Sequence, residues 1–168
     1  MTKYSLQIAR VSTPVGPTKQ AVGTGFIIKN TSSTNDITFL TNAHVVAPGQ
    51  RHFVEMAWCK PKTIPVSVVA ICYDRDLSLL KCSREAWEAA VDEHVGQTEE
   101  AAYIKSAPPL ELGTQVMLSP IGTSVCCQGH PLGLPTQQLS WGQTRGVYNM
   151  PNGEQRYLIQ APINHGNS

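Results

Sequence analysis

The sequence ends on a serine in a setting that could make it a nucleophile. Its last six residues are Ile163-Asn164-His165-Gly166-Asn167-Ser168. A serine hydroxyl is a poor nucleophile at neutral pH, so it needs a base to take its proton and N–H donors to hold the oxyanion that forms. Glycine lets the backbone turn successive N–H groups toward one point. We therefore expect the N–H groups of Gly166 and Ser168 to form an oxyanion hole, although Gly-Asn-Ser alone is also an ordinary turn sequence.

Two residues far upstream could supply the base and the group that orients it. His44 closely follows an apolar run that ends at Thr41, and Asp76 stands directly before a second apolar run. Each residue also has a more ordinary role, because a histidine can simply bond to backbone carbonyls and Asp76 could serve a turn or pair with Arg75. In the order His44, Asp76, Ser168, however, they are the parts of a triad for nucleophilic acyl transfer.

The elements that must position these residues are mostly strands. Short apolar stretches rich in β-branched residues recur through the first half and are separated by turn residues, which predicts an all-β fold. Six strands suit a small closed barrel, because closure removes exposed sheet edges. The predicted strands run from Ser5 to Val11, Ala21 to Ile28, Asp36 to Thr41, His52 to Ala57, Ile64 to Tyr73 and Leu77 to Lys81.

Glycine and proline mark the irregular places in this first half. Pro14, Gly16 and Pro17 predict a loop between the first two strands. Gly23 and Gly25 fall inside the second strand, where they indicate either a bulge or a close approach of another backbone.

The middle of the chain predicts helix. Ser83 can cap a helix that contains Trp87, and Gly96 can end it. A second short helix is expected near residues 99–102. The strand pattern then returns from Gln115 to Leu118, Ser124 to Gln128, Gln138 to Asn149 and Gln155 to Pro162. We therefore divide the chain into a first barrel (1–82), a helical connector (83–106) and a partial second barrel (107–168).

Composition excludes several functional classes. The 168 residues carry a net charge of +1 with no basic run, so a nucleic-acid partner is not expected. Five cysteines without ligand spacing, two of them adjacent, favour reduced core or near-core thiols over structural zinc, and the histidines also lack metal-site spacing. The three tryptophans are expected to be packing residues. Because the first residues contain no long apolar run, we expect no membrane span and a cytoplasmic or nuclear location.

Six stretches, in this order, resemble the trypsin-like serine proteases of the HtrA/Deg family. They cover most of the chain, and their order makes the resemblance far more specific than any one stretch. The matching stretches are Gly23-Thr24-Gly25-Phe26-Ile27-Ile28, Leu40-Thr41-Asn42-Ala43-His44-Val45-Val46, Asp76-Leu77-Ser78-Leu79-Leu80-Lys81, Gly129-His130-Pro131-Leu132-Gly133, Gly146-Val147 and the last six residues.

The resemblance implies a two-barrel fold with the active site in the cleft between the barrels. His44 would act as general base, Asp76 would hold its tautomer, and Ser168 would attack a peptide carbonyl. It also implies a serine endopeptidase of polypeptide substrates that uses no cofactor or metal. Members of the family often form homo-oligomers, so a homo-oligomer is included among the expected partners.

The sequence also departs from the family pattern. Asn167 stands where digestive-type relatives carry an aspartate that pairs with a freed N-terminus, so the resemblance favours regulation by loops instead, with residues 131–137 and 142–154 as candidates. The glycine pair that normally follows the serine, further strands and a PDZ module do not follow, so we expect a truncated sequence. The alternative function is a catalytically silent protease-like module that binds peptides, or an inactive fragment.

Overall fold

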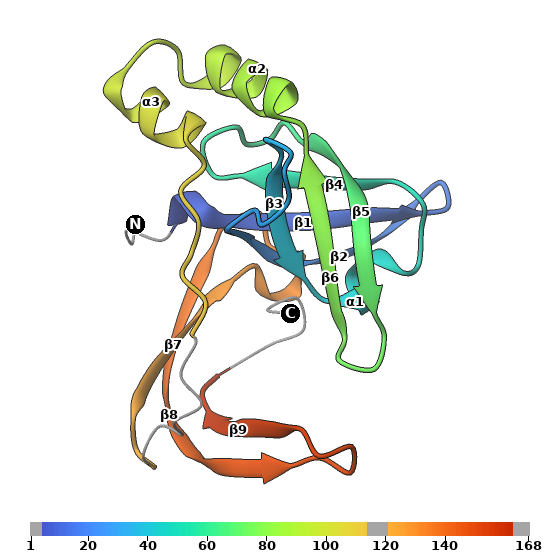
Figure 1. Cartoon of the computed structure of the whole chain (residues 1–168), viewed down its shortest axis with the longest axis vertical. Coiled ribbons are helices and arrows are strands. Elements are labelled where there is room, and N and C mark those ends of the chain that lie inside the picture. Colours follow the sequence, from blue (N-terminus) through green and yellow to red (C-terminus); the bar gives the residue numbers. More distant parts are fainter. Residues whose placement is uncertain (1–4, 114–120, 163–168) are drawn as a thin grey trace.

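The first half of the molecule is a closed barrel. A computed structural model describes residues 5–113 and 121–162, and Figure 1 shows the barrel above a smaller curved sheet. The barrel strands pair antiparallel in the order β1-β2-β3-β6-β5-β4, and β4 pairs back onto β1. The all-β prediction and the six-stranded barrel are confirmed. Its strands are β1 (Ile8–Val15), β2 (Lys19–Ile28), β3 (Ile37–Thr41), β4 (His52–Met56), β5 (Ile64–Cys72) and β6 (Leu77–Cys82).

Alternating side chains fill the barrel. Along β3, Ile37, Phe39 and Thr41 are buried while the residues between them are half-buried. This period of two follows from the pleat, which points successive side chains to opposite faces of a sheet. Strand β6 also buries every second residue, and the continuous core of the barrel includes Val11, Val54 and Leu80 as well.

The predicted start of the barrel needs two corrections. Ser5–Gln7 form a short 3₁₀ helix, η1, rather than the beginning of the first strand. Strand β1 instead runs on to Val15, so Pro14 lies in the strand and not in the loop. Pro14 is tolerated there because β4 pairs only with Ala9–Ser12 of β1, so a ladder donor is not required at the proline on that side.

Gly25 marks a close approach and not a bulge. The pairing of β1 with β2 is regular through Gly23 and Gly25, with no shift in register. A Cβ on Gly25 would lie 2.9 Å from Val11 Cγ2, which is closer than real Cβ atoms approach, and 3.1 Å from the Leu40 carbonyl oxygen, which is tighter than most Cβ contacts. The expectation of a close approach is therefore correct for Gly25, because the strand packs there where only hydrogen fits.

The helical segment is part of the barrel's core. Helix α2 (Arg84–His94) begins where Ser83 Oγ accepts from the N–H of Ala86, and its chain turns at Gly96 with φ +82°. Helix α3 (Glu99–Lys105) follows. Trp87 is completely buried, and its indole N–H donates to the Ile104 carbonyl at 2.9 Å. The predicted connector thus covers one end of the first barrel as well as leading onward.

The second sheet is small and largely uncovered. It contains β7 (Ser124–Gly129), β8 (Gln138–Asn149) and β9 (Gln155–Gln160), with the 3₁₀ helix η2 (Pro131–Gly133) between β7 and β8. Every residue of β9 is exposed, and Trp141 on β8 is 68% exposed. The expectation that Trp141 is a packing residue is wrong for the described residues. The predicted strand from Gln115 to Leu118 lies outside them.

Two further sequence expectations change with this sheet. Residues 142–149 were predicted both in the strand from Gln138 to Asn149 and in a candidate regulatory loop. They belong to β8, which confirms the strand, and the tight turn between β8 and β9 covers only residues 150–154. Of the cysteines, Cys59 and Cys82 are buried, whereas Cys72 and Cys126 are exposed and are not core thiols. Within the described ranges, no helix has the length and apolar character needed to cross a membrane.

Candidate active site

His44 is presented at the rim of the barrel by a single helical turn. Strand β3 ends at Thr41, Asn42 is extended with φ −89° and ψ 147°, and α1 (Ala43–Val46) follows at once. Ala43, Val45 and Val46 are buried and anchor this turn in the core, while the His44 side chain is 45% exposed. The apolar neighbours in the sequence therefore direct the imidazole outward.

Asp76 faces His44 from the turn that joins β5 to β6. Its N–H donates to the Tyr73 carbonyl at 3.2 Å, and its φ is +54°. Few residues other than glycine adopt this left-handed conformation, and aspartate is among those that tolerate it. The side chain of Asn42 donates to the Asp76 carbonyl at 2.8 Å, which ties this turn to the segment that carries the histidine.

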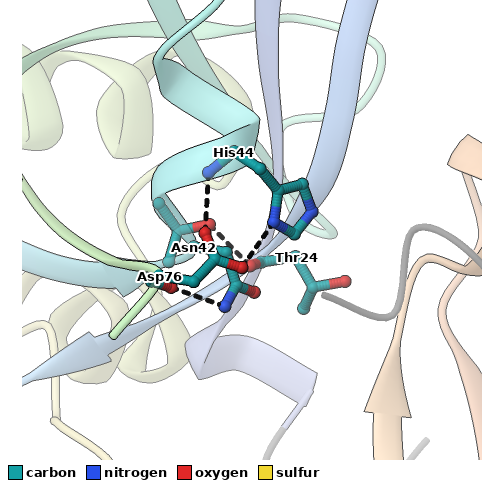
Figure 2. A network of polar contacts seen from close by, with 5 residues as sticks. Thr24, Asn42, His44 and Asp76 are labelled. Carbon is teal, nitrogen blue, oxygen red and sulfur yellow. Dashed lines mark hydrogen bonds and ion pairs between the residues drawn. The ribbon is translucent and has the colours of Figure 1, made fainter. Parts of the chain in front are cut away.

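The two side chains form a tight pair (Figure 2). Asp76 Oδ1 accepts from the His44 backbone N–H at 2.9 Å, and Asp76 Oδ2 lies 2.6 Å from His44 Nδ1. A carboxylate can only accept, so Nδ1 carries the proton, and Nε2 is the nitrogen of the neutral ring that can accept one. The ring is thereby held in the tautomer that a general base requires.

The carboxyl group of Asp76 is held in its ionised form. Partial burial by itself raises the pKa of Asp76, but hydrogen bonds from the backbone and side chain of His44, its charge and the N–H of Ala43 together outweigh burial. The pKa of Asp76 is therefore lower than its ordinary value of 3.8. An ionised carboxylate at this position favours a positively charged imidazole when His44 takes a proton.

A small cavity is shared by the two β units; its lining includes Asn42 and Leu77, the sequence neighbours of the segments that carry the pair, but neither His44 nor Asp76. It has a volume of about 180 Å³, and Gln128 of β7 is the one described residue of the second sheet that lines it. The barrel residues of its lining are Thr24, Phe26, Leu40, Thr41, Asn42 and Leu77. A larger cavity of about 440 Å³ lies between β4 and residues 128–139 and includes neither His44 nor Asp76 in its lining.

The sequence reasoning placed two of its candidate residues in contact and left others untested. His44 and Asp76 meet as predicted. Ser168 and Gly166 lie outside the described residues, so the nucleophile and the oxyanion hole stay predictions. Arg75 does not pair with Asp76: its Nε lies 3.1 Å from Glu154 Oε1 on the turn between β8 and β9.

Two supporting residues were missed. Asn42 was noted only as part of a motif, yet the hydrogen bond from its side-chain amide to the Asp76 carbonyl fixes the turn. Glu154 could not be identified from the sequence, because its contact with Arg75 joins the two β units and no spacing pattern in the sequence predicts that contact. The pKa of Glu154 is lowered, chiefly by its hydrogen bond with Arg156.

The remaining described histidines have structural settings. His52 Nδ1 lies 2.9 Å from Thr13 Oγ1, and burial lowers its pKa. His94 lies 3.7 Å from Glu93 at the end of α2. His130 is buried and bonds through Nδ1 to the Leu134 carbonyl. Among the described residues no three His, Cys, Asp or Glu side chains gather as metal ligands.

Comparisons with known proteins agree with this geometry. Residues 23–168 match the family model described as the trypsin-like peptidase domain. No curated protein matches the chain.

Solved protease structures share the fold. The active form of the Rv3671c protease from M. tuberculosis aligns with a TM-score of 0.68 and 20% identity, over 98% of this chain and 63% of that one. The inactive form of that protease aligns with a TM-score of 0.64, 20% identity and coverage of 98% and 70%. The HtrA-type protease AlgW, solved with a tripeptide, aligns with a TM-score of 0.63 and 17% identity, over 99% of this chain and 46% of that one. The chain thus spans about 63% of the length of the first of these proteases, and the low identities show a shared fold alone.

Proposed function

Because the chain belongs to the trypsin-like peptidase domain family, we propose that it is a serine endopeptidase of the HtrA/Deg type that hydrolyses unfolded or flexible polypeptides. The observation that carries this proposal is the pairing of His44 Nδ1 with Asp76 Oδ2 at 2.6 Å. In a serine protease the aspartate holds the histidine in the tautomer and orientation in which the ring acts as base, and this pairing has that geometry. The family match, which runs to residue 168, supports the same assignment for the serine.

In the proposed reaction, His44 accepts one proton and then donates it in each half of the cycle. Its Nε2 takes the proton of Ser168 Oγ while that oxygen bonds to the substrate's carbonyl carbon. The carbonyl oxygen becomes an oxyanion, to which the N–H groups of Gly166 and Ser168 donate. The carbon–nitrogen bond then breaks, and His44 gives its proton to the leaving amine. The products of this half are a free amine and an acyl ester on Ser168.

Water completes the cycle by the same route. His44 takes a proton from the water as its oxygen attacks the ester, and the second oxyanion occupies the same hole. The ester bond to Ser168 breaks, and the proton on His44 returns to the serine oxygen. Asp76 stays ionised throughout and stabilises the imidazolium of each step, while each oxyanion donor supplies about 3 to 4 kcal/mol to the transition state.

A fluorophosphonate probe tests the proposal, because it reacts with an activated serine without requiring knowledge of the substrate. We expect the chain to be labelled, and we expect labelling to fall by at least about 10³-fold in Ser168→Ala and His44→Ala. The matched controls are Ser124→Ala, an exposed serine on β7, and His94→Ala on α2; both should label like the parent.

The outcomes separate the proposal from its alternative. Labelling that survives His44→Ala unchanged would falsify the triad. A folded chain that is not labelled, yet binds an unfolded polypeptide, would instead identify a catalytically silent peptide-binding module.

A further inference from the structure

Thr24 on β2 touches the second sheet where β7 ends. Its Oγ1 accepts a hydrogen bond from the backbone N–H of His130 at 2.9 Å, in a buried position. A Cβ on Gly129 would lie only 2.6 Å from Thr24 Oγ1 and 3.3 Å from its Cβ. The end of β7 therefore approaches the barrel as closely as it does because residue 129 is glycine and residue 24 offers an acceptor.

Thr24 also contacts the segment that carries His44. The Thr41 hydroxyl donates to the Thr24 carbonyl at 2.8 Å, and Thr41 is the last residue of β3 before Asn42 and α1. Figure 2 draws Thr24 in one network of polar contacts with Asn42, His44 and Asp76. One residue thus bonds through its side chain to the second unit and through its backbone carbonyl to Thr41, which leads into the segment that carries His44.

Arg10, the cross-strand neighbour of Thr24, holds the other end of residues 130–134 of the second unit. Arg10 on β1 stands opposite Thr24 in the register, and its Nε donates to the Gly133 carbonyl at 3.1 Å. Within the segment, His130 Nδ1 bonds to the Leu134 carbonyl at 2.9 Å, which closes residues 130–134 into a compact turn. Two adjacent side chains of the barrel therefore hold both ends of one turn of the second unit.

We propose that Thr24 is a positioning residue that sets where the second sheet lies relative to the His44–Asp76 pair. The catalytic part of this inference rests on the proposed function, in which the second unit supplies the nucleophile and the barrel supplies the base. Such a reaction is sensitive to placement, because a displacement of about 1 Å can reduce a rate by about 10²-fold. Thr24→Val keeps the shape of the side chain and removes its only hydrogen-bonding atom, whereas Thr24→Ser keeps the hydroxyl.

The first experiment measures placement without using activity. The exposed thiols of Cys72 on the barrel and Cys126 on β7 can be nitroxide-labelled in a Cys127→Ser background, because Cys59 and Cys82 are buried. Double electron–electron resonance then reports the distance between the two units. We expect a shifted or broadened distance distribution in Thr24→Val, and the parental distribution in Thr24→Ser.

The control is Thr38→Val on β3, where a half-buried threonine has no side-chain hydrogen bond within the described part of the chain. An unchanged distribution in Thr24→Val would overturn the proposal.

A paired substitution guards against simple misfolding. Gly129→Ala should disturb the distance and lower the unfolding temperature, because the new methyl group meets the Thr24 side chain. Combining it with Thr24→Ala removes the two atoms of residue 24 beyond Cβ that obstruct the methyl group. The double variant should therefore be less disturbed than Gly129→Ala alone. Purely additive effects of the two substitutions would contradict a direct contact between them.

Fluorophosphonate labelling then tests the consequence for catalysis. We expect Thr24→Val to label about 10- to 100-fold more slowly than the parent, with the same midpoint of its pH profile, because His44 and Asp76 keep their own contacts. Thr24→Ser should restore the rate. An altered distance with an unchanged labelling rate would refute the catalytic role. If Thr24→Val alters the distance but the parent itself is never labelled, the positioning role of Thr24 holds and the proposed endopeptidase is rejected.

Discussion

Asp76 contacts His44 twice, once at the backbone N–H through Oδ1 and once at ring Nδ1 through Oδ2, at 2.9 and 2.6 Å. The first contact fixes the position of the short helix that carries the histidine, and the second fixes the orientation and tautomer of the ring. Since the two contacts use different oxygens of one carboxylate, a substitution can disturb the second while leaving the first.

Asp76→Asn is such a substitution. Asparagine also tolerates the positive φ of 54° at this position, and its amide oxygen can still accept from the His44 backbone. Its NH₂ group would face Nδ1 and favour the tautomer with the proton on Nε2, which is useless as a base. We expect the rate of fluorophosphonate labelling to fall by about 10⁴-fold. Asp74→Asn, in the same exposed turn, is the matched control and should leave the rate unchanged.

The lowered pKa of Asp76 predicts a loss of stability in acid. A carboxyl group with a folded-state pKa below its unfolded value stabilises the fold above the unfolded pKa of about 3.8, and this contribution disappears as the pH falls through the folded pKa. The side chain is 43% exposed, so solvent screening keeps the effect below about 1 kcal/mol. Urea unfolding of the parent and Asp76→Asn should therefore differ at pH 6 and converge near pH 2. A difference that persists undiminished in acid would contradict this assignment.

His130 predicts a second pH effect, at a higher pH. Burial lowers its pKa, and the charges of Arg10 and Lys60 lower it further, against the opposing effect of the Leu134 carbonyl. His130 therefore binds a proton more readily in the unfolded chain than in the folded one. The free energy of unfolding should fall as the pH drops below about 6.5, by up to about 1.4 kcal/mol per pH unit between the unfolded and the folded pKa.

A His130→Asn variant tests this effect, since asparagine can still donate to the Leu134 carbonyl. Its stability should change less than that of the parent between pH 7 and pH 5. The pKa of His52 is also lowered by burial, so His52→Asn serves as the comparison. Parallel stability curves for the parent and His130→Asn would show that His130 does not titrate in this window.

Trp87 predicts how firmly the helices hold the barrel. Its ring is completely buried, packs edge-on against Trp58 at 5.1 Å and donates to the Ile104 carbonyl. Trp87→Ala should cost about 3 to 5 kcal/mol of unfolding free energy, measured by denaturant titration. Trp141→Ala, which removes a 68% exposed ring, should cost less than about 1 kcal/mol. Similar losses for the two tryptophans would refute the view that α2 belongs to the core.

The sequence alone was sufficient for the features that depend on neighbouring residues. Short apolar stretches rich in β-branched residues, separated by turn residues, located all six barrel strands, since such residues favour the pleated, half-buried surface of a sheet. Ser83 and Gly96 located the two ends of α2 through local capping. The motif around His44 and the position of Asp76 before β6 also identified the pair that meets. His44 lies just after the end of β3 and Asp76 just before the start of β6, so the sequence marks both places.

Only the tertiary structure decided which distant groups meet. It buried Trp87 of the predicted connector in the barrel, paired Arg75 with Glu154, and brought Thr24 against Gly129 and His130. Residues such as these are separated by many positions in the chain, and their contacts depend on how whole strands and helices pack. Local propensity and periodicity describe neighbours along the chain, so they carry no signal for such contacts, which the three-dimensional arrangement of the packed elements creates.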